Sequence, residues 1–357
     1  MRVLHLPLNI ASQTSVTVRA LRQIGVEARG IIISSHVIQS ADGLEIYSME
    51  SSSRLERGFL GARRSAPILA AIRWADVVHY HFDASALPRG LDLRWVRLLN
   101  KPGVAEFWGS DIRIPEVEAA DNPYYVRLGA AYEYHSMESY AKSRDVQAKF
   151  AGAGLDCLIS CNSLRPYLQP DLFSTVYFAR QRVWLPEFDP NPPDPARSRL
   201  VIVHSPSAPN AKGTPAVLAA IDSLRGRFDF DFRLIQGMPR RQALDLVRDA
   251  DIFLDQFVLG AYGMAALEAM AFGKPVLCYV KPSLVAQYPS DLPIVNATQD
   301  SLTDVLAGLL ADGARRHEIG LRSRDYLEKY HDAIKIAGEL KGIYEDLLQR
   351  RRTRETP

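Results

Sequence analysis

The chain has 357 residues, a length that corresponds to about two domains of ordinary size. Hydrophobic residues make up 47% of it and charged residues 24%, and this balance excludes disorder as the main state. The 43 lysine and arginine residues against 41 aspartate and glutamate residues leave a net charge of +2, so no global basic field points to nucleic acid, and any anion site must be local.

Cysteine content and apolar runs narrow the class of protein further. Three cysteines, Cys157, Cys161 and Cys278, do not make a disulfide framework or a zinc-ligand spacing, so we expect reduced thiols in a cytoplasmic protein. The run Met1–Leu8 is too short for a secretory signal and is typical of a first strand. No apolar run reaches the ~18 residues of a membrane-spanning helix.

The first half alternates short apolar runs with helical patterns. The predicted strands are Val3–Leu6, Ile31–Ile33, Asp76–Tyr80 and Val104–Phe107, with helices that end near Gly25 and Ala75. Strand, helix and strand at this spacing predict parallel strands joined by crossover helices.

A helical, tyrosine-rich segment, Asp121–Ala151, interrupts this alternation. Two interpretations remain open. One is a surface helix pair with half-buried rings. The other is a wall of the ligand cleft, where the rings and hydroxyl groups would face a ligand.

Five prolines then crowd into residues 186–195, a stretch that neither pairs in a sheet nor continues a helix. We therefore expect a domain over residues 1–185, a linker over 186–199, a second domain over 200–330 and a C-terminal helix over 331–357.

The second half restarts the alternation. The predicted strands are Leu200–His204, Phe230–Gln236, Asp251–Leu254 and Val276–Val280, the predicted helices are Thr214–Leu224, Arg240–Ala250 and Met264–Phe272, and Leu321–Arg350 is helical. The fold class is α/β, with two Rossmann-like, doubly wound parallel sheets. We expect them to face a central cleft, because such sheets bind ligands at the carboxyl ends of their strands.

The most informative stretch is Leu259–Val276, in which a glycine loop opens directly into a helix. Gly260 and Gly263 allow a tight loop with close backbone approach. The first amides of the helix, at Gly263, Met264 and Ala265, have no partners within it and form a local anion site.

Two side chains extend this site. Glu268 lies about one and a half turns into the helix. A carboxylate there can accept hydrogen bonds from the hydroxyls of a ribose beside a diphosphate. The alternative is a solvated glutamate on an exposed helix. Lys212 lies in the loop Ser207–Pro215 after a strand and supplies the cation that a diphosphate needs. Gly213 permits close approach there.

The run Ala266–Val276, preceded by Lys212-Gly213-Thr214, resembles family 4 glycosyltransferases, which are GT-B enzymes with two Rossmann-like domains. The resemblance is strong over Val201–Val280 and looser over the N-terminal half. It implies transfer of a sugar from a nucleotide diphosphate donor, UDP- or GDP-linked, with retention of configuration and without an essential metal or other cofactor. The N-terminal domain would bind the acceptor and the C-terminal domain the donor.

The resemblance also assigns residues. Lys212 would meet the diphosphate, Glu268 the ribose, and main chain near Gly237 and Met238 the base. The full predicted donor site is Asn9, Ser12, Gly237, Met238, Gly260, Gly263, Met264, Ala265, Lys212 and Glu268, of which Lys212 and Glu268 would be catalytic. Asn9 and Ser12 take the place of the family's glycine-rich phosphate loop after the first strand.

The chain departs from the family pattern at three positions. Gly260 stands where the family commonly has a glutamate that touches the donor sugar, Ser207 where it often has an arginine, and Trp108 where it usually has a histidine. The turn that follows Trp108 is kept. The predicted acceptor side is His81, Trp108, Asp111 and Arg113.

Three further signals are given structural interpretations. Asp229-Phe-Asp231 and Asp249-Ala-Asp251 spell the acidic pair of metal-dependent glycosyltransferases, but we interpret them as a solvated turn and a helix end. His79 and His81 share one strand face without a third metal ligand in view. The basic segment Arg54–Arg64 fits a solvated loop, or weak contact with anionic lipid at the cytoplasmic membrane face.

The leading prediction is therefore a cytoplasmic, metal-independent, retaining glycosyltransferase of glycan, glycolipid or metabolite biosynthesis. Its partners would be a nucleotide-sugar donor and a hydroxyl acceptor. An inactive relative that binds nucleotide or glycan as a scaffold or regulator is the alternative, because of the departures. A nucleotide-sugar epimerase of the same fold is a lesser one.

Overall fold

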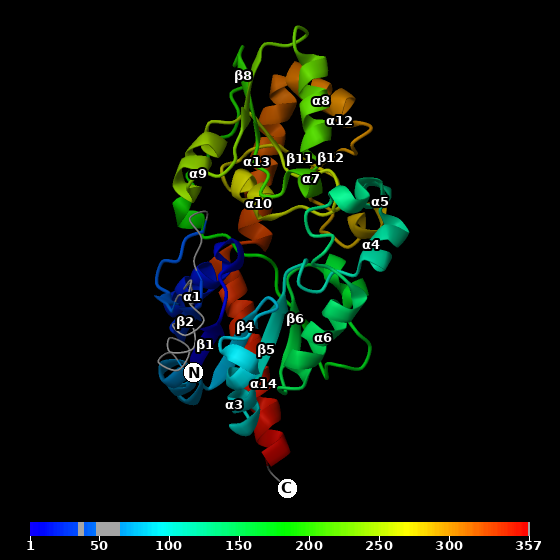
Figure 1. Ribbon diagram of the computed structural model, residues 1–357. Coiled ribbons are helices and arrows are strands. Elements are labelled where there is room, and N and C mark those ends of the chain that lie inside the picture. Colours follow the sequence, from blue (N-terminus) through cyan, green and yellow to red (C-terminus); the bar gives the residue numbers. More distant parts are fainter. Residues whose placement is uncertain (35–38, 48–64, 356–357) are drawn as a thin grey trace. The chain divides into compact units, whose positions relative to one another are not determined.

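The computed structural model describes residues 1–34, 39–47 and 65–355 (Figure 1). The chain divides into two compact units and passes between them more than once. The first unit contains Met1–Ile114, Glu138–Arg182 and the chain from Ala333 onward. The second contains Pro115–Met137 and Val183–Asp332.

A parallel sheet with the strand order β3-β2-β1-β4-β5-β6-β7 forms the centre of the first unit, within the described residues. Its strands are β1 (Arg2–Leu6), β2 (Glu27–Ile32), β3 (Glu45–Ile46), β4 (Val77–His81), β5 (Gly103–Phe107), β6 (Asp156–Ile159) and β7 (Val176–Phe178). β4, β5 and β6 are buried along their whole length, as expected of strands that helices cover on both faces.

Helices flank this sheet. They are α1 (Gln13–Gln23), a helix that includes residues 65–74, α3 (Leu91–Leu98), α6 (Tyr140–Ala151) and α14 (Ala333–Glu355), with short 3₁₀ turns η1 (Ile10–Ser12), η2 (Pro88–Gly90) and η4 (Asn162–Tyr167). α14, the red helix in Figure 1, packs against α1 and β4, so the end of the chain completes the unit that its beginning starts.

The second unit contains a parallel sheet with the strand order β12-β11-β10-β8-β9. Its strands are β8 (Leu200–His204), β9 (Phe230–Leu234), β10 (Ile252–Leu254), β11 (Val276–Cys278) and β12 (Val295–Asn296). Its helices are α4 (Pro115–Asp121), α5 (Pro123–Leu128), η3 (Gly129–Ala131), η5 (Leu185–Glu187), α7 (Pro209–Lys212), α8 (Thr214–Leu224), α9 (Arg240–Arg248), α10 (Met264–Ala271), α11 (Pro282–Val285), α12 (Leu302–Ala311) and α13 (Gly313–Tyr330).

Each sheet reverses its strand order once. The reversal lies between β1 and β4 in the first unit and between β8 and β10 in the second. Doubly wound sheets bind ligands at such switch points, outside the carboxyl ends of the strands. The predicted α/β class with two doubly wound parallel sheets is confirmed.

The chain passes from the first unit to the second between Arg182 and Val183, ahead of the proline-rich stretch. That stretch packs on the second unit: the Asn191 amide donates to the Phe272 carbonyl (2.8 Å), and the Lys274 ammonium donates to the Asn191 carbonyl. The expected linker at 186–199 is therefore drawn within the second unit.

The helical stretch expected over Leu321–Arg350 consists of two helices. α13 ends at Tyr330 and α14 begins at Ala333. His331, which lies between them in the sequence, is buried, and its carbonyl accepts from the Val183 amide at 2.8 Å. The break is also where the chain returns to the first unit, so α13 belongs to one unit and α14 to the other.

Candidate functional site

Two loops of the second unit follow the strands on either side of its switch point. The loop after β8 contains α7 and Lys212, and the loop after β10 contains Gly260 and Gly263 and leads into α10. Because carboxyl ends of neighbouring parallel strands lie at the same edge, both loops lie at one edge of the sheet.

The structure brings Lys212 and Gly263 together. A Cβ atom added at Gly263 would lie 3.0 Å from Lys212 Nζ, so the ammonium lies directly beside the start of α10. The Lys212 side chain is only 16% exposed. Since α10 begins at Met264, the amides of Met264 and Ala265 point out of its N-terminus without an intrahelical partner.

Asp255, which the sequence analysis did not select, joins the two groups. Its Oδ1 lies 3.2 Å from Lys212 Nζ, and its Oδ2 accepts from the Gly263 amide at 2.8 Å. The signal available in the sequence was its position directly after β10, at the carboxyl end of a strand beside the switch point. One carboxylate therefore holds the cation and the loop in fixed relation.

The missing glutamate at Gly260 has a physical explanation. Gly260 has φ +69°, and a Cβ atom there would lie 2.9–3.0 Å from carbons of the Lys281 side chain. The Lys281 stem thus fills the space beside residue 260. Its ammonium lies 2.8 Å from Asp121 and 3.1 Å from Glu118. No larger side chain fits at 260 unless Lys281 moves.

Glu268 is paired and is not a free surface glutamate. Its Oε1 accepts from Arg240 Nη2 at 2.8 Å and from Arg240 Nε at 3.1 Å. Arg240, the first residue of α9, also lies 3.3 Å from Glu187. The two carboxylates raise the pKa of its guanidinium against the opposing effect of burial. Because Gly237 and Met238 directly precede α9, this pair connects the predicted base loop with α10.

The stretch Pro115–Met137, which we call the excursion, contacts these loops and stabilises them. Glu133 accepts from the amides of Asn210 (2.6 Å) and Ala211 (2.8 Å) at the start of α7, and Asn122 donates to the Val258 carbonyl at 2.7 Å. Tyr125 and Tyr132 pack with Ala208, Ala211 and Val258 in one apolar cluster. Of the segment Asp121–Ala151, expected to be surface helices or a cleft wall, residues 121–137 therefore pack against the Lys212 loop, whereas α6 belongs to the first unit.

In the first unit, Asn9 and Ser12 follow β1 at its switch point. Both have protein partners: Asn9 accepts from the Ser15 amide at 3.1 Å and donates to the Ser40 carbonyl at 2.7 Å, and Ser12 accepts from the Ser40 amide at 2.9 Å. Ala11 and Ser12 have φ of +47° and +63°, a left-handed turn that favours glycine. The turn therefore contains two left-handed residues although neither is glycine.

His81 belongs to a buried polar network with His79, His5 and Glu106. The ligand atoms of the three histidines lie within 4.8 Å of one another, so the structure brings His5 to the pair as a third ring that the sequence analysis did not identify. The rings of His79 and His81 are stacked with 10° between their planes, and Arg182 already neutralises Glu106 at 2.6 and 2.9 Å. This arrangement fits neutral imidazoles in a hydrogen-bond network better than ligands that converge on an ion.

The Asp111 side chain stabilises the predicted acceptor turn at residues 108–113. The Asp111 carboxylate accepts from the amides of Trp108 (2.9 Å), Gly109 (2.7 Å) and Ile112 (3.1 Å), and burial raises its pKa to about 6. Arg113 lies 2.6 Å from Glu138. The Trp108 ring stacks on His81, and its Nε1 is buried without a hydrogen-bond partner.

Both acidic pairs lie at the amino ends of strands, opposite to Lys212. Asp251 is buried, accepts from the Val201 amide at 2.7 Å and pairs with Arg197 at 3.2 Å. Asp231 pairs with Arg233. These contacts agree with a structural interpretation of the two pairs. The basic segment Arg54–Arg64 lies outside the described residues, so its interpretation stays a prediction.

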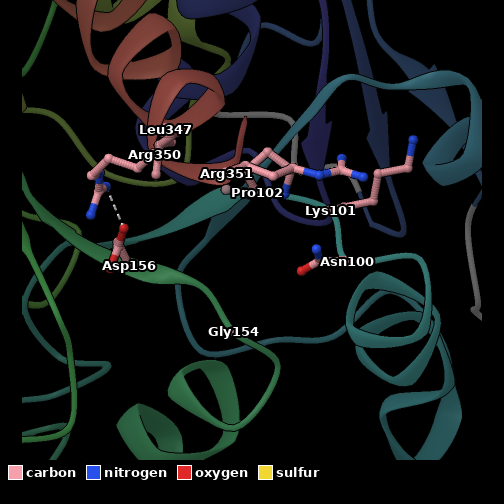
Figure 2. Close-up of a pocket in the computed structure, with 9 residues that line it drawn as sticks. Asn100, Lys101, Pro102, Gly154, Asp156, Leu347, Arg350 and Arg351 are labelled. Atoms are coloured by element: carbon pink, nitrogen blue, oxygen red, sulfur yellow. Dashed lines mark hydrogen bonds and ion pairs between the residues drawn. The ribbon is translucent and has the colours of Figure 1, made fainter. Parts of the chain in front are cut away.

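A cavity of ≈ 70 Å³ in the first unit lies at the amino ends of β5 and β6 (Figure 2). Figure 2 shows Arg350 turned toward Asp156, with Lys101 and Arg351 on the other side of the cavity. Lys101 donates to backbone carbonyls at Arg73 and Ala75, so its charge is engaged by the protein. Within the same sheet, the predicted acceptor residues His81 and Trp108 lie at the other, carboxyl ends of the strands.

No protein-family model matches the sequence, and no curated protein sequence matches it either. Among the described helices, none combines the length and apolar character needed to cross a membrane.

Solved structures share the fold over nearly the whole chain. Sucrose-phosphate synthase from Thermosynechococcus elongatus is similar over 98% of this chain and 100% of its own, with a TM-score of 0.64 and 11% identity. A glycosyltransferase from Rickettsia africae ESF-5 is similar over 97% of this chain and 98% of its own, with a TM-score of 0.65 and 13% identity. HepE of Anabaena, solved in complex with UDP, is similar over 97% of this chain and 100% of its own, with a TM-score of 0.56 and 14% identity. The predicted GT-B fold is confirmed.

Proposed function

We propose that the protein is a retaining, metal-independent glycosyltransferase, which transfers a sugar from a nucleotide diphosphate donor to an acceptor hydroxyl. The observation that supports this most directly is the position of the Lys212 ammonium beside Gly263, at the N-terminus of α10 and at the switch point of a GT-B sheet. A diphosphate needs such a combination of a cation and unpaired amides.

In this proposal the donor diphosphate is the leaving group. Lys212 and the amides of Met264 and Ala265 stabilise the negative charge that develops on it, and fixed dipoles and charges of this kind are usually the largest catalytic contribution. Glu268, held by Arg240, accepts from the ribose hydroxyls. Main chain at Gly237 and Met238 binds the base. These groups need no metal ion to balance the diphosphate.

We propose a UDP-linked sugar as the first donor to test, with a GDP-linked sugar as the second. HepE, which shares this fold, has been solved with UDP and with UDP-glucose. The first unit would bind the acceptor near Trp108 and Arg113. Buried, free thiols at Cys157 and Cys278 favour a cytoplasmic location, where an acceptor could be a sugar, a metabolite or a lipid-linked glycan.

A second candidate is an inactive relative that binds nucleotide without turnover. Gly260 favours it, because this residue offers no carboxylate to a donor sugar and the Lys281 side chain fills the space beside it.

One experiment separates the two. The protein is incubated with a panel of UDP- and GDP-sugars, with and without a pool of sugar and lipid-linked acceptors, and free nucleoside diphosphate is measured. Release that an acceptor stimulates supports transfer, and inversion of the product's anomeric configuration would contradict the retaining mechanism. Tight nucleotide binding without release under any condition supports the inactive relative.

A further inference from the structure

Asp255 stands where a diphosphate is proposed to bind. Its side chain is 1% exposed, and it accepts from Lys212 (3.2 Å) and from the Gly263 amide (2.8 Å), with the Cys278 thiol as a third donor at 3.6 Å. Both of the first two donors are groups that the proposed function assigns to the diphosphate or to its immediate surroundings. The carboxylate thus competes with a diphosphate for these two donors.

We propose that Asp255 is the counter-charge of the donor site: it positions the Lys212 ammonium at the start of α10, and it lowers the affinity of that ammonium for the diphosphate. This inference rests on the proposed function and deepens it. It makes Asp255 a positioning residue that acts through Lys212, and it assigns to it the release of the nucleoside diphosphate product.

The charge is the part of Asp255 that matters for this role. An asparagine of the same size still accepts from the Gly263 amide through its oxygen, but its NH₂ group cannot accept from an ammonium. The Lys212 backbone stays in place, because its amide donates to the Ala208 carbonyl (2.9 Å) and its carbonyl accepts from the Phe257 amide (3.0 Å). The ammonium is then less closely positioned but has no neutralising partner, so its full charge acts on a bound diphosphate. If Asp255 were only a scaffold, the same substitution would disorder Lys212 and weaken binding. The sign of the change in affinity therefore distinguishes the two roles.

The chain offers a matched control in Asp251, at the other end of β10. It is as buried as Asp255 and accepts from the Val201 amide at 2.7 Å, but it lies at the amino end of the strand. Asp251→Asn removes the same charge from the same strand. We expect it to lower thermal stability and to leave nucleotide affinity unchanged.

The experiment measures binding of UDP, GDP, uridine and guanosine by calorimetry to the full-length wild type, Asp255→Asn, Asp251→Asn, Lys212→Ala and the Lys212→Ala/Asp255→Asn double variant. We expect Asp255→Asn to bind the nucleoside diphosphate at least fivefold more tightly than wild type, with a steeper salt dependence and no change for the nucleoside. The gain should vanish in the double variant. Asp255→Ser provides a second variant if Asp255→Asn does not fold.

Two results would overturn the inference in distinguishable ways. If wild type binds a nucleoside diphosphate through Lys212, but Asp255→Asn binds it equally or more weakly, then Asp255 is only a scaffold and the proposed function stands. If folded wild type and Asp255→Asn bind neither nucleoside diphosphates nor inorganic pyrophosphate, the proposed function fails and the counter-charge role fails with it.

Discussion

Lys212 is the residue on which the proposed chemistry depends most. Its ammonium lies between the Asp255 carboxylate and the start of α10, and it is largely shielded from water. A charge in such a position interacts more strongly with a phosphate than one on an open surface does, because water screens it less.

Replacing Lys212 with alanine should therefore lower nucleoside diphosphate affinity about 10- to 100-fold, since a hydrogen bond to a charged group contributes about 1.5–3 kcal/mol. Nucleoside affinity should not change. Calorimetry with both ligands checks this prediction. Lys329→Ala is the matched control, because Lys329 pairs with Asp291 at 2.9 Å on the surface of the same unit. An equal loss for nucleoside and diphosphate would contradict a phosphate role for Lys212.

Glu268 allows a second prediction at this scale. Glu268→Gln should weaken ribonucleotides roughly five- to tenfold and leave 2′,3′-dideoxy analogues unchanged, since one net hydrogen bond contributes about 1 kcal/mol. Glu187→Gln is the control, because Glu187 pairs with the same arginine, Arg240, at 3.3 Å. If the variant at 268 keeps the wild-type preference for ribonucleotides, Glu268 does not contact the ribose.

Among the elements, the loop between β10 and α10 is the most constrained. Gly260 combines a left-handed backbone with close packing against Lys281, whose ammonium is held by Glu118 and Asp121 from the excursion at residues 115–137. The same excursion reaches the start of α7 through Glu133. One segment thus fixes both loops of the candidate site.

This packing predicts that a side chain at residue 260 destabilises the second unit. Gly260→Ala should lower stability by about 1–2 kcal/mol for the left-handed backbone alone, and Gly260→Glu by more, because Lys281 must move. Gly308→Ala is the control: its Cβ meets nothing within 4 Å on the exposed face of α12, and it should stabilise by about 0.5–1 kcal/mol. Thermal unfolding measures all three. If Gly260→Glu is as stable as wild type, the Lys281 side chain moves aside at little cost and the predicted loss of stability is wrong.

For the molecule as a whole, the buried histidine network predicts how stability depends on pH. Burial lowers the pKa of His5 and His79, and it lowers that of His81 to about 3. In the unfolded chain these groups titrate near 6.5. As the pH falls below about 6.5, the unfolded state binds protons that the folded state cannot bind, so stability falls by up to about 1.4 kcal/mol per pH unit for each group.

Two buried carboxyl groups of the first unit act in opposite directions, Glu106 inside the network and Asp111 outside it. Arg182 and the neighbouring histidines lower the pKa of Glu106 despite its burial, which adds to the loss of stability at acid pH. Asp111, with its pKa raised to about 6, binds a proton more readily when folded and opposes the loss between about pH 6 and 4. Three histidines outweigh one aspartate. We expect the unfolding temperature to be lower at pH 5 than at pH 7.5. An equal or higher unfolding temperature at pH 5 would contradict the prediction that the three histidines resist protonation in the folded protein.

The sequence predicted β1, β4, β5 and β8 to β11 close to their observed bounds, because buried parallel strands are continuous apolar runs and the breaks between them are marked by glycine and proline. It did not predict β6, although that strand is buried along its whole length. β8 and α8 have the predicted bounds. It also identified Lys212 and the glycine loop, because a lysine after a strand and glycines before a helix can be recognised from neighbouring residues alone. It did not select Asp255 or Arg240, because an aspartate after a strand and an arginine at a helix start are ordinary until their partners are known.

By itself, then, the sequence determined the alternation of strands and helices, the glycine loop at the start of a helix, and the residue types available to bind a diphosphate. Only the tertiary structure decided which charges meet: Asp255 with Lys212, Glu268 with Arg240, and Lys281 with the acids of the excursion. These pairs join residues 28 to 163 positions apart, and contacts over such separations depend on the sheet order and not on any local pattern.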